Sequence, residues 1–253
     1  MNKTAIAFGT FDGVHRGHQE IINAMLSAAK RGGLDPLIYT FSNHPAGLFG
    51  KSFSMIMTDG ERLAALERLA PVAAERLDRQ FAATEPEDFV RHMAEKYRMG
   101  AAVAGFNYTF GSRGAGNMDT LRRLGGKYGF EVYEIPALMY GGEPVSSTRI
   151  RACIERGDIA GANAMLGHEL ELSCKETSQN GRAVLKVADG LVLPAPGRYI
   201  TEAEGRRLVC GVSPGGSIEP ECCQPPGGTL RRRREGGSYA AFCPVAPSSR
   251  RSP

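Results

Sequence analysis

Several signatures that would assign a site at once are absent from this 253-residue sequence. It has neither a GxGxxG dinucleotide fingerprint nor a GxxxxGK[ST] phosphate loop. None of its six cysteines has the C-x-x-C spacing of a metal site. Its apolar runs are too short to span a bilayer, and it lacks a basic segment followed by an apolar stretch of signal-peptide length. These absences predict a cytoplasmic protein with no membrane partner, whose chemistry must come from other residues.

The formal net charge of +4 is unevenly distributed along the chain. From Gly205 onward there are eight arginines, no lysine and three glutamates, so the rest of the chain is nearly neutral. The arginine run at residues 231–234 has few aromatic neighbours that could stack on bases, which argues against a nucleic-acid partner. Residues 205–253 are rich in Gly and Pro and have little apolar periodicity, and we expect a disordered tail there.

The most informative segment is GTFDGVHRGH, residues 9–18. It follows a short apolar run at residues 4–8 that is typical of a buried strand, and helical periodicity begins at Arg16. Its three glycines allow the backbone to pass close to a ligand. A strand, a glycine turn and a helix N-terminus therefore meet where His15 and His18 can add hydrogen bonds. This combination predicts a phosphate site.

Strand-like and helical segments alternate over the first two thirds of the chain. Strands are expected at residues 4–8, 36–41, 101–105 and 130–135, and the later helices near 118–127, 147–156 and 158–166. The alternation predicts an α/β fold with a doubly wound parallel sheet. A capping box at residues 58–61 starts an earlier helix, whose apolar face we place at Leu63, Leu66 and Leu69.

In an open parallel sheet, ligands bind beyond the carboxyl ends of the strands, so the loops after the strands should carry the chemistry. Two further unusual loops do follow strands, SNHP at residues 42–45 and FNYTFG at residues 106–111. After the last strand, VSSTRIR opens a helix. Its Ser147 and Thr148 can cap the helix and donate hydrogen bonds, while Arg149 and Arg151 suit phosphate oxygens. Alone this segment is an ordinary capped helix, but with the histidines it predicts a two-part phosphate site.

The segments GTFDGVHRGH, SNHP, GFNYTFG and VSSTRIR, in this order, resemble the N-terminal adenylyltransferase module of bacterial FAD synthetases, the bifunctional riboflavin kinase/FMN adenylyltransferases. The resemblance covers residues 1–168. It implies a Rossmann-like nucleotidyltransferase domain that transfers AMP from ATP to FMN and releases FAD and pyrophosphate. ATP and FMN would be the substrates, and Mg²⁺ would act with ATP. The ligands of the metal and the oligomeric state are left open.

The resemblance also implies a role for each matching residue. Catalytic roles fall on His15, His18 and Arg151. Contacts with ATP fall on Gly9, Phe11, Asp12, Gly17, Ser147, Thr148 and Arg149. Contacts with the flavin fall on His44, Pro45, Asn107 and Phe110. Many relatives carry Asp where this chain has Asn107, which weakens the case for a metal-binding carboxylate there.

A riboflavin kinase barrel should follow residue 168 in this family, with a signature that ends in Pro-Thr-Ala-Asn. That signature is missing. We therefore expect an incomplete β-barrel remnant at residues 169–204, without kinase activity. The tail at residues 205–253 matches nothing in the family, and one hypothesis for its composition is a GC-rich gene translated in a shifted frame.

Two alternatives to this function stay open. A related nucleotidyltransferase with another phosphate acceptor, such as phosphopantetheine, would share the histidine pair. A truncated, non-catalytic homologue could instead bind flavin nucleotides without turning them over.

Overall fold

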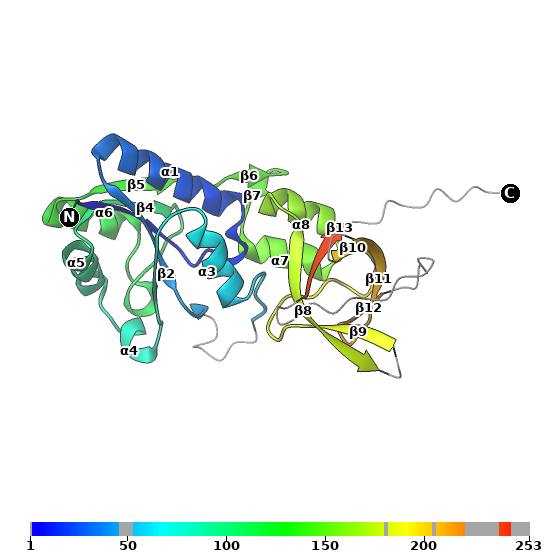
Figure 1. Ribbon diagram of the computed structural model, residues 1–253. Coiled ribbons are helices and arrows are strands. Elements are labelled where there is room, and N and C mark those ends of the chain that lie inside the picture. Colours follow the sequence, from blue (N-terminus) through cyan, green and yellow to red (C-terminus); the bar gives the residue numbers. More distant parts are fainter. Residues whose placement is uncertain (1, 46–52, 180–181, 204–205, 221–237, 244–253) are drawn as a thin grey trace. The chain divides into compact units, whose positions relative to one another are not determined.

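The computed structural model describes residues 2–45, 53–179, 182–203, 206–220 and 238–243 (Figure 1). Contacts divide the chain into two units. The first comprises Met1–Phe53 and Asp59–Val145, and the second comprises Ser54–Thr58 and Ser146–Pro253. The sequence places a domain boundary at residue 168, whereas in the structure the two helices before that residue group with the second unit.

The first unit is built on a five-stranded sheet in the order β3-β2-β1-β4-β5. All neighbouring strands are parallel. The strands are β1 (Thr4–Phe8), β2 (Asp35–Phe41), β3 (Val72–Glu75), β4 (Met99–Gly105) and β5 (Glu131–Ile135). The predicted α/β fold with a doubly wound parallel sheet is confirmed. The sequence did not predict β3, because this four-residue edge strand carries two alanines and lacks the β-branched run that marks a central strand.

Helices connect these strands (Figure 1). They are α1 (Arg16–Gly32), α3 (Asp59–Glu67), α4 (Arg79–Ala82), α5 (Pro86–Lys96) and α6 (Met118–Tyr128). Two short 3₁₀ turns, η1 (Asp12–Val14) and η2 (Ser112–Gly114), and a small hairpin of β6 (Met139–Tyr140) and β7 (Glu143–Pro144) complete the unit. No helix in the described part of the chain is long and apolar enough to cross a membrane.

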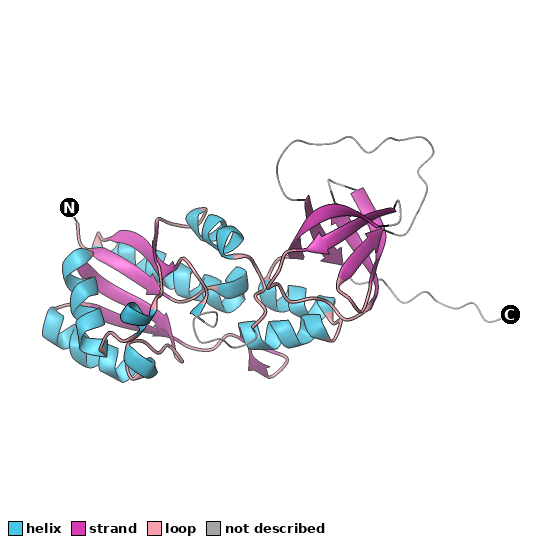
Figure 2. Cartoon of the chain, turned by 90° about the horizontal axis from the view of Figure 1, so that it is seen from below, coloured by secondary structure: helices cyan, strands magenta, loops and turns pink. Residues whose placement is uncertain are grey.

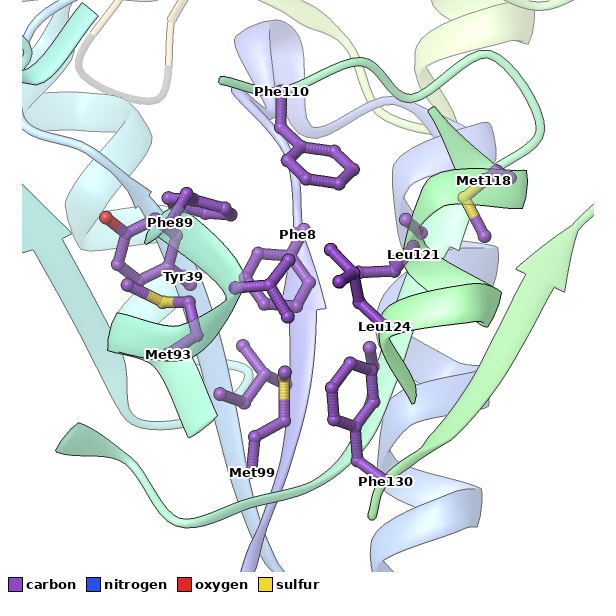
Figure 3. Packing of buried hydrophobic residues seen from close by; sticks show 14 residues of the cluster. Phe8, Tyr39, Phe89, Met93, Met99, Phe110, Met118, Leu121, Leu124 and Phe130 are labelled. Carbon is purple, nitrogen blue, oxygen red and sulfur yellow. The ribbon is translucent and has the colours of Figure 1, made fainter. Parts of the chain in front are cut away.

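The core of the first unit lies between the sheet and the pair α5 and α6 (Figure 3). Phe8 of β1 packs edge-on against Phe89 of α5, with ring centroids 6.1 Å apart. Ala5 and Ala7 alternate with the residues of that face and are fully buried on the other side, where α1 contacts β1 and β4. Burial on both faces fixes the end of β1, from which the candidate site begins.

The second unit joins two helices to an antiparallel barrel (Figure 2). The helices are α7 (Ser147–Glu155) and α8 (Ile159–Leu166). The strands are β8 (Leu170–Gln179), β9 (Arg182–Val187), β10 (Gly197–Ala203), β11 (Arg206–Val212), β12 (Ser217–Pro220) and β13 (Ser238–Cys243). They close a barrel in the order β10-β11-β12-β9-β8-β13.

Barrel strands after residue 169 were predicted, but their closure and extent were not. β11, β12 and β13 lie within the segment for which the sequence predicts a disordered tail, and that expectation does not describe them. The reason is visible in β11, where Cys210 and Val212 alternate onto the buried side and join Ile218 of β12. A buried cysteine acts here as a small apolar residue. The arginine run at residues 231–234 and the end of the predicted tail lie outside the described residues.

Candidate active site

The turn that follows β1 is held in an uncommon backbone conformation. Phe11, Gly13 and Val14 all have positive φ, at 56°, 79° and 39°. For Phe11 and Val14 this left-handed geometry is strained, since their Cβ atoms crowd the backbone. Such strain persists only where the surroundings fix the chain, and it concentrates at functional sites. The turn is buried as well, because Phe11 and Asp12 are at most 1% exposed.

This turn ends at His15, whose imidazole caps α1. The backbone N–H of His18 donates to Nδ1 of His15 across 3.3 Å, so the ring accepts one of the unpaired donors of the helix N-terminus. A neutral imidazole that accepts at Nδ1 carries its proton on Nε2. The cap therefore fixes both the place of the ring and the nitrogen that can donate.

The two histidine rings are stacked on each other. Their centroids are 3.5 Å apart and their planes differ by 16°. Phe11 meets His18 edge-on, with centroids 5.3 Å apart. A Cβ on Gly17 would stand 3.2 Å from Cε1 of His15, and one on Gly9 would stand 2.9 Å from Cζ of Phe11. At both glycines the rings of the site take up the space of a Cβ, and the structure brings Gly9, Phe11, His15, Gly17 and His18 together.

The ring of His18 has a nitrogen available to bind an anion. Its Nδ1 is buried without a hydrogen-bond partner. Burial, together with the neighbouring His15 ring and the charge of Arg62, holds the pKa of His18 well below its ordinary value of 6.5. The ring is consequently neutral at neutral pH, and a bound phosphate would raise its pKa by favouring the protonated form.

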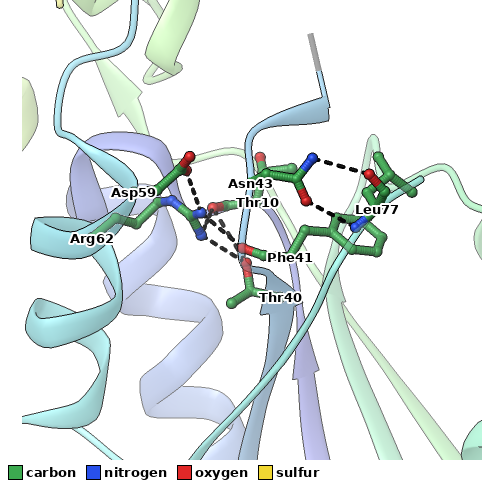
Figure 4. Close-up of polar contacts among 7 residues, drawn as sticks. All are labelled: Thr10, Thr40, Phe41, Asn43, Asp59, Arg62 and Leu77. Atoms are coloured by element: carbon green, nitrogen blue, oxygen red, sulfur yellow. Dashed lines mark hydrogen bonds and ion pairs between the residues drawn. The ribbon is translucent and has the colours of Figure 1, made fainter. Parts of the chain in front are cut away.

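Arg62 is a residue of this site that sequence analysis missed (Figure 4). It lies on α3 and is only 2% exposed. One terminal nitrogen donates to the Thr10 carbonyl oxygen and the Thr40 hydroxyl, both at 3.0 Å. The other donates to the Phe41 carbonyl oxygen and pairs with Asp59, both at 2.8 Å. Its guanidinium therefore joins the loop that follows β1 to the end of β2.

The SNHP loop, which carries the predicted flavin contacts His44 and Pro45, lies at the same edge of the sheet. Asn43 exchanges two hydrogen bonds with the backbone of Leu77, at 2.9 and 3.0 Å, and so anchors the SNHP loop (Figure 4). His44 stacks on Phe53, with ring centroids 4.2 Å apart. Pro45 follows it and is partly exposed.

Two flavin candidates come from the loop after β4. Asn107 is exposed and can reach a ligand. Phe110 is buried in the cluster of Figure 3, where its ring centroid lies 5.6 Å from that of Phe89. It also stacks on Tyr108, with ring centroids 5.5 Å apart. Its side chain is thus part of the core, and the neighbouring Tyr108, whose pKa burial raises, lies between it and Phe8.

The VSSTRIR candidates lie on α7, in the second unit. The helix is capped by Ser146, whose hydroxyl accepts from the Arg149 N–H at 3.3 Å, so Ser147 and Thr148 are not the cap that the sequence predicts. Arg151 donates to the Thr148 hydroxyl at 3.2 Å. The pairing of Ser147, Thr148, Arg149 and Arg151 with the histidines of the first unit stays a prediction.

Among the described residues, no group of three or more His, Cys, Asp or Glu side chains could hold a metal ion. Mg²⁺ is commonly bound through one or two carboxylates together with substrate phosphates and water. The donor set near the histidines fits that mode, because Asp12 supplies a single buried carboxylate in the turn.

Comparison with known proteins gives a consistent result. A family model described as FAD synthetase matches residues 1–149. The chain is 30% identical over 221 residues to the FAD synthetase of Listeria monocytogenes, across 83% of this chain and 88% of that protein. It is 28% identical over 216 residues to the bifunctional riboflavin kinase/FMN adenylyltransferase of Bacillus subtilis, across 80% of this chain and 68% of that protein.

A solved structure of a macrolide-efflux protein from Streptococcus pneumoniae has a similar fold, with a TM-score of 0.77 at 23% identity. The match covers 97% of this chain and 86% of that one. The shared fold therefore includes the barrel strands as well as the parallel sheet.

Proposed function

The chain belongs to the FAD synthetase family, whose members are nucleotidyltransferases, and from that premise we propose that it makes FAD from FMN and ATP. A phosphate oxygen of FMN forms a bond to the α-phosphorus of ATP. The bond from the α-phosphorus to the oxygen that bridges it to the β-phosphorus breaks, and pyrophosphate leaves. Both reacting groups are anionic, so the site must align and neutralise phosphates more than it must supply a base.

The observation that carries the proposal is the stacked pair of His15 and His18 at the start of α1. Their rings stand at a helix N-terminus, beyond the carboxyl end of β1, where anions are favoured. His15 is held as a donor at Nε2, and a phosphate beside His18 would favour the protonated form of its ring. Both would therefore stabilise charge that develops on the phosphate oxygens in the transition state.

The remaining roles follow from the family and from side-chain chemistry. We propose that Gly9, Phe11, Asp12 and Gly17 shape the nucleotide cradle. Ser147, Thr148, Arg149 and Arg151 would bind the β- and γ-phosphates, because hydroxyls and guanidinium groups donate to anionic oxygens. Mg²⁺ would enter with ATP and neutralise part of its phosphate charge.

On the flavin side, His44, Pro45 and Asn107 would contact FMN. Phe110 would support that surface from the core through Tyr108, with which it stacks. We further propose that the barrel does not phosphorylate riboflavin, because the expected Pro-Thr-Ala-Asn run is missing from this chain. A cytoplasmic location and the lack of a nucleic-acid partner remain predictions of the sequence.

Chromatographic assay of FAD and pyrophosphate would test the proposal. The purified chain is incubated with ATP and Mg²⁺, in parallel with FMN, with riboflavin and with phosphopantetheine. We expect FAD from FMN and no FMN from riboflavin. FMN formation from riboflavin would overturn the statement about the barrel. Tight FMN binding without FAD at high enzyme concentration would favour the non-catalytic binder, and an adenylylated phosphopantetheine would favour the other acceptor.

A further inference from the structure

We propose that Arg62 is a positioning residue for adenylyl transfer, which fixes the turn that presents His15 and His18. The inference rests on the proposed function and extends it to a residue outside the family segments GTFDGVHRGH, SNHP, GFNYTFG and VSSTRIR. Arg62 contacts neither histidine by hydrogen bond. It acts through the backbone of Thr10, which lies directly before the strained Phe11.

The contacts of Arg62 are directed at polar groups just beyond β1 and at the end of β2 rather than at apolar side chains. Among the residues that the structure describes, its one carboxylate partner is Asp59, whose side chain is 33% exposed. Its other hydrogen bonds go to the Thr10 and Phe41 carbonyl oxygens and to the Thr40 hydroxyl. Burying a guanidinium costs desolvation energy that one partly exposed carboxylate offsets poorly, so stability alone does not account for it. Leu66, one turn further along α3, shows that an apolar side chain is accommodated on this face.

Thr10 is the point at which Arg62 controls the turn. The Thr10 carbonyl oxygen accepts from Arg62 at 3.0 Å and from the Thr40 hydroxyl at 3.4 Å. The next residue, Phe11, has φ of 56°, a conformation that relaxes unless neighbouring contacts hold it. Phe11 in turn meets the edge of the His18 ring. Loss of the two donors to Thr10 should therefore shift the stacked rings and slow the chemical step more than it weakens substrate binding.

The Arg62 guanidinium also changes the pKa of His18. The charged or titratable groups of the surrounding elements are His15 at the start of α1, Asp12 in η1, and Arg62 with Asp59 on α3. Burial lowers the pKa of His18 most, and the neighbouring His15 ring and the positive charge of Arg62 lower it further. Removal of the Arg62 charge should raise the pKa of His18, whereas an unrelated defect in α3 should leave it unchanged.

Three variants separate positioning from ordinary stability. Arg62→Met removes the fork and the charge, Arg62→Lys keeps the charge and three donors, and Leu66→Ala is the matched control that loosens α3 by a cavity. All are assayed well below their unfolding temperatures for FAD formation. We expect Arg62→Met to lower kcat about 100-fold with KM changed less than about threefold. Arg62→Lys should recover about tenfold of that loss, and Leu66→Ala should keep kcat within about twofold.

The pH titration of the His18 ring, followed by NMR without substrates, gives a readout independent of activity. It should move to higher pH in Arg62→Met and stay in place in Arg62→Lys and Leu66→Ala. Equal kcat in Arg62→Met and Leu66→Ala, or an unchanged His18 titration in Arg62→Met, would overturn the proposal. If Arg62→Met does not fold, Arg62→Lys decides, because it loses the guanidinium geometry and its kcat should still lie about tenfold below that of the wild type. A kcat in Arg62→Lys equal to that of Leu66→Ala would then overturn the proposal.

Failure of the proposed function looks different from failure of this inference. If the wild-type chain forms no FAD, the proposed function fails, while the His18 titration still decides whether Arg62 acts on the site. If the wild-type chain forms FAD and Arg62→Met behaves as Leu66→Ala does, only the role of Arg62 is rejected.

Discussion

Two helices of this chain begin with residues predicted to bind phosphate, and their first turns are built differently. α1 is capped by the buried imidazole of His15, and a strained turn and a stacked ring surround that cap. α7 is capped by the hydroxyl of Ser146, with an exposed Thr148 that accepts from Arg151. The first arrangement is fixed by burial before any ligand binds. The second offers long side chains that reach solvent.

Because of this difference, we expect the first turns of α1 and α7 to act at different stages of the reaction. Groups fixed before binding stabilise charge that appears only in the transition state, because they need no reorganisation during the reaction. Partly exposed cations bind substrate and transition state with similar strength, since the terminal phosphates of ATP are charged throughout. We therefore expect changes in α1 to lower kcat and changes in α7 to raise KM for ATP.

His18→Ala should show the largest effect. The variant removes the partly buried imidazole without removing a side-chain hydrogen bond that holds the fold, and we expect kcat to fall about 1,000-fold with little change in the unfolding temperature. Steady-state FAD formation and thermal unfolding measure the two quantities. His92→Ala, at an exposed histidine of α5, is the control and should retain full activity. A rise in KM for ATP with unchanged kcat would reverse the roles assigned to the two helices.

Arg151→Ala should have a smaller effect of a different kind. We expect KM for ATP to rise about tenfold and kcat to fall by less than that factor, because a partly exposed guanidinium contributes about 1 to 2 kcal/mol to phosphate binding. Arg156→Ala, at the other end of the same helix, is the matched control and should leave both constants unchanged. A loss in kcat as large as that of His18→Ala would show that α7 acts in the chemical step as well.

Much of the fold could be predicted from sequence because the apolar periodicity of the central elements is strong. The limits predicted for β1 coincide with those observed, and those of α6, α7 and α8 agree within a residue. The short edge strand β3 and the strands after residue 205 escaped prediction. Their pairing is decided by partners far away in the sequence rather than by local pattern.

The candidate site likewise contains residues that the sequence predicts and one that it does not. The ring cluster around His15 and His18 could be predicted because a local motif, GTFDGVHRGH, builds it. Arg62 could not, since its partners Thr10 and Phe41 are distant in sequence, and the apolar stripe of α3 was placed at Leu63, Leu66 and Leu69. In the structure Arg62 and Leu66 are the buried residues of that helix, and Leu69 is 44% exposed. A charged residue four positions before a buried leucine was the available signal.

The smallest predicted effect concerns the pH dependence of stability, to which His18 of α1 should contribute and Arg151 of α7 should not. The folded chain holds the pKa of His18 well below 6.5, while in the unfolded chain the ring titrates near that value. Between the two pKa values only the unfolded chain binds the proton, so the free energy of unfolding falls as pH falls below about 7. The slope from this one group approaches about 1.4 kcal/mol per pH unit.

Urea unfolding at pH 7.5 and 5.5 measures this effect. The free energy of unfolding should fall between the two pH values by about 1 kcal/mol more in the wild type than in His18→Gln. Arg151→Ala should keep the wild-type loss, because Arg151 does not titrate in this range, and an equal loss in His18→Gln would mean that His18 is not held neutral by the fold.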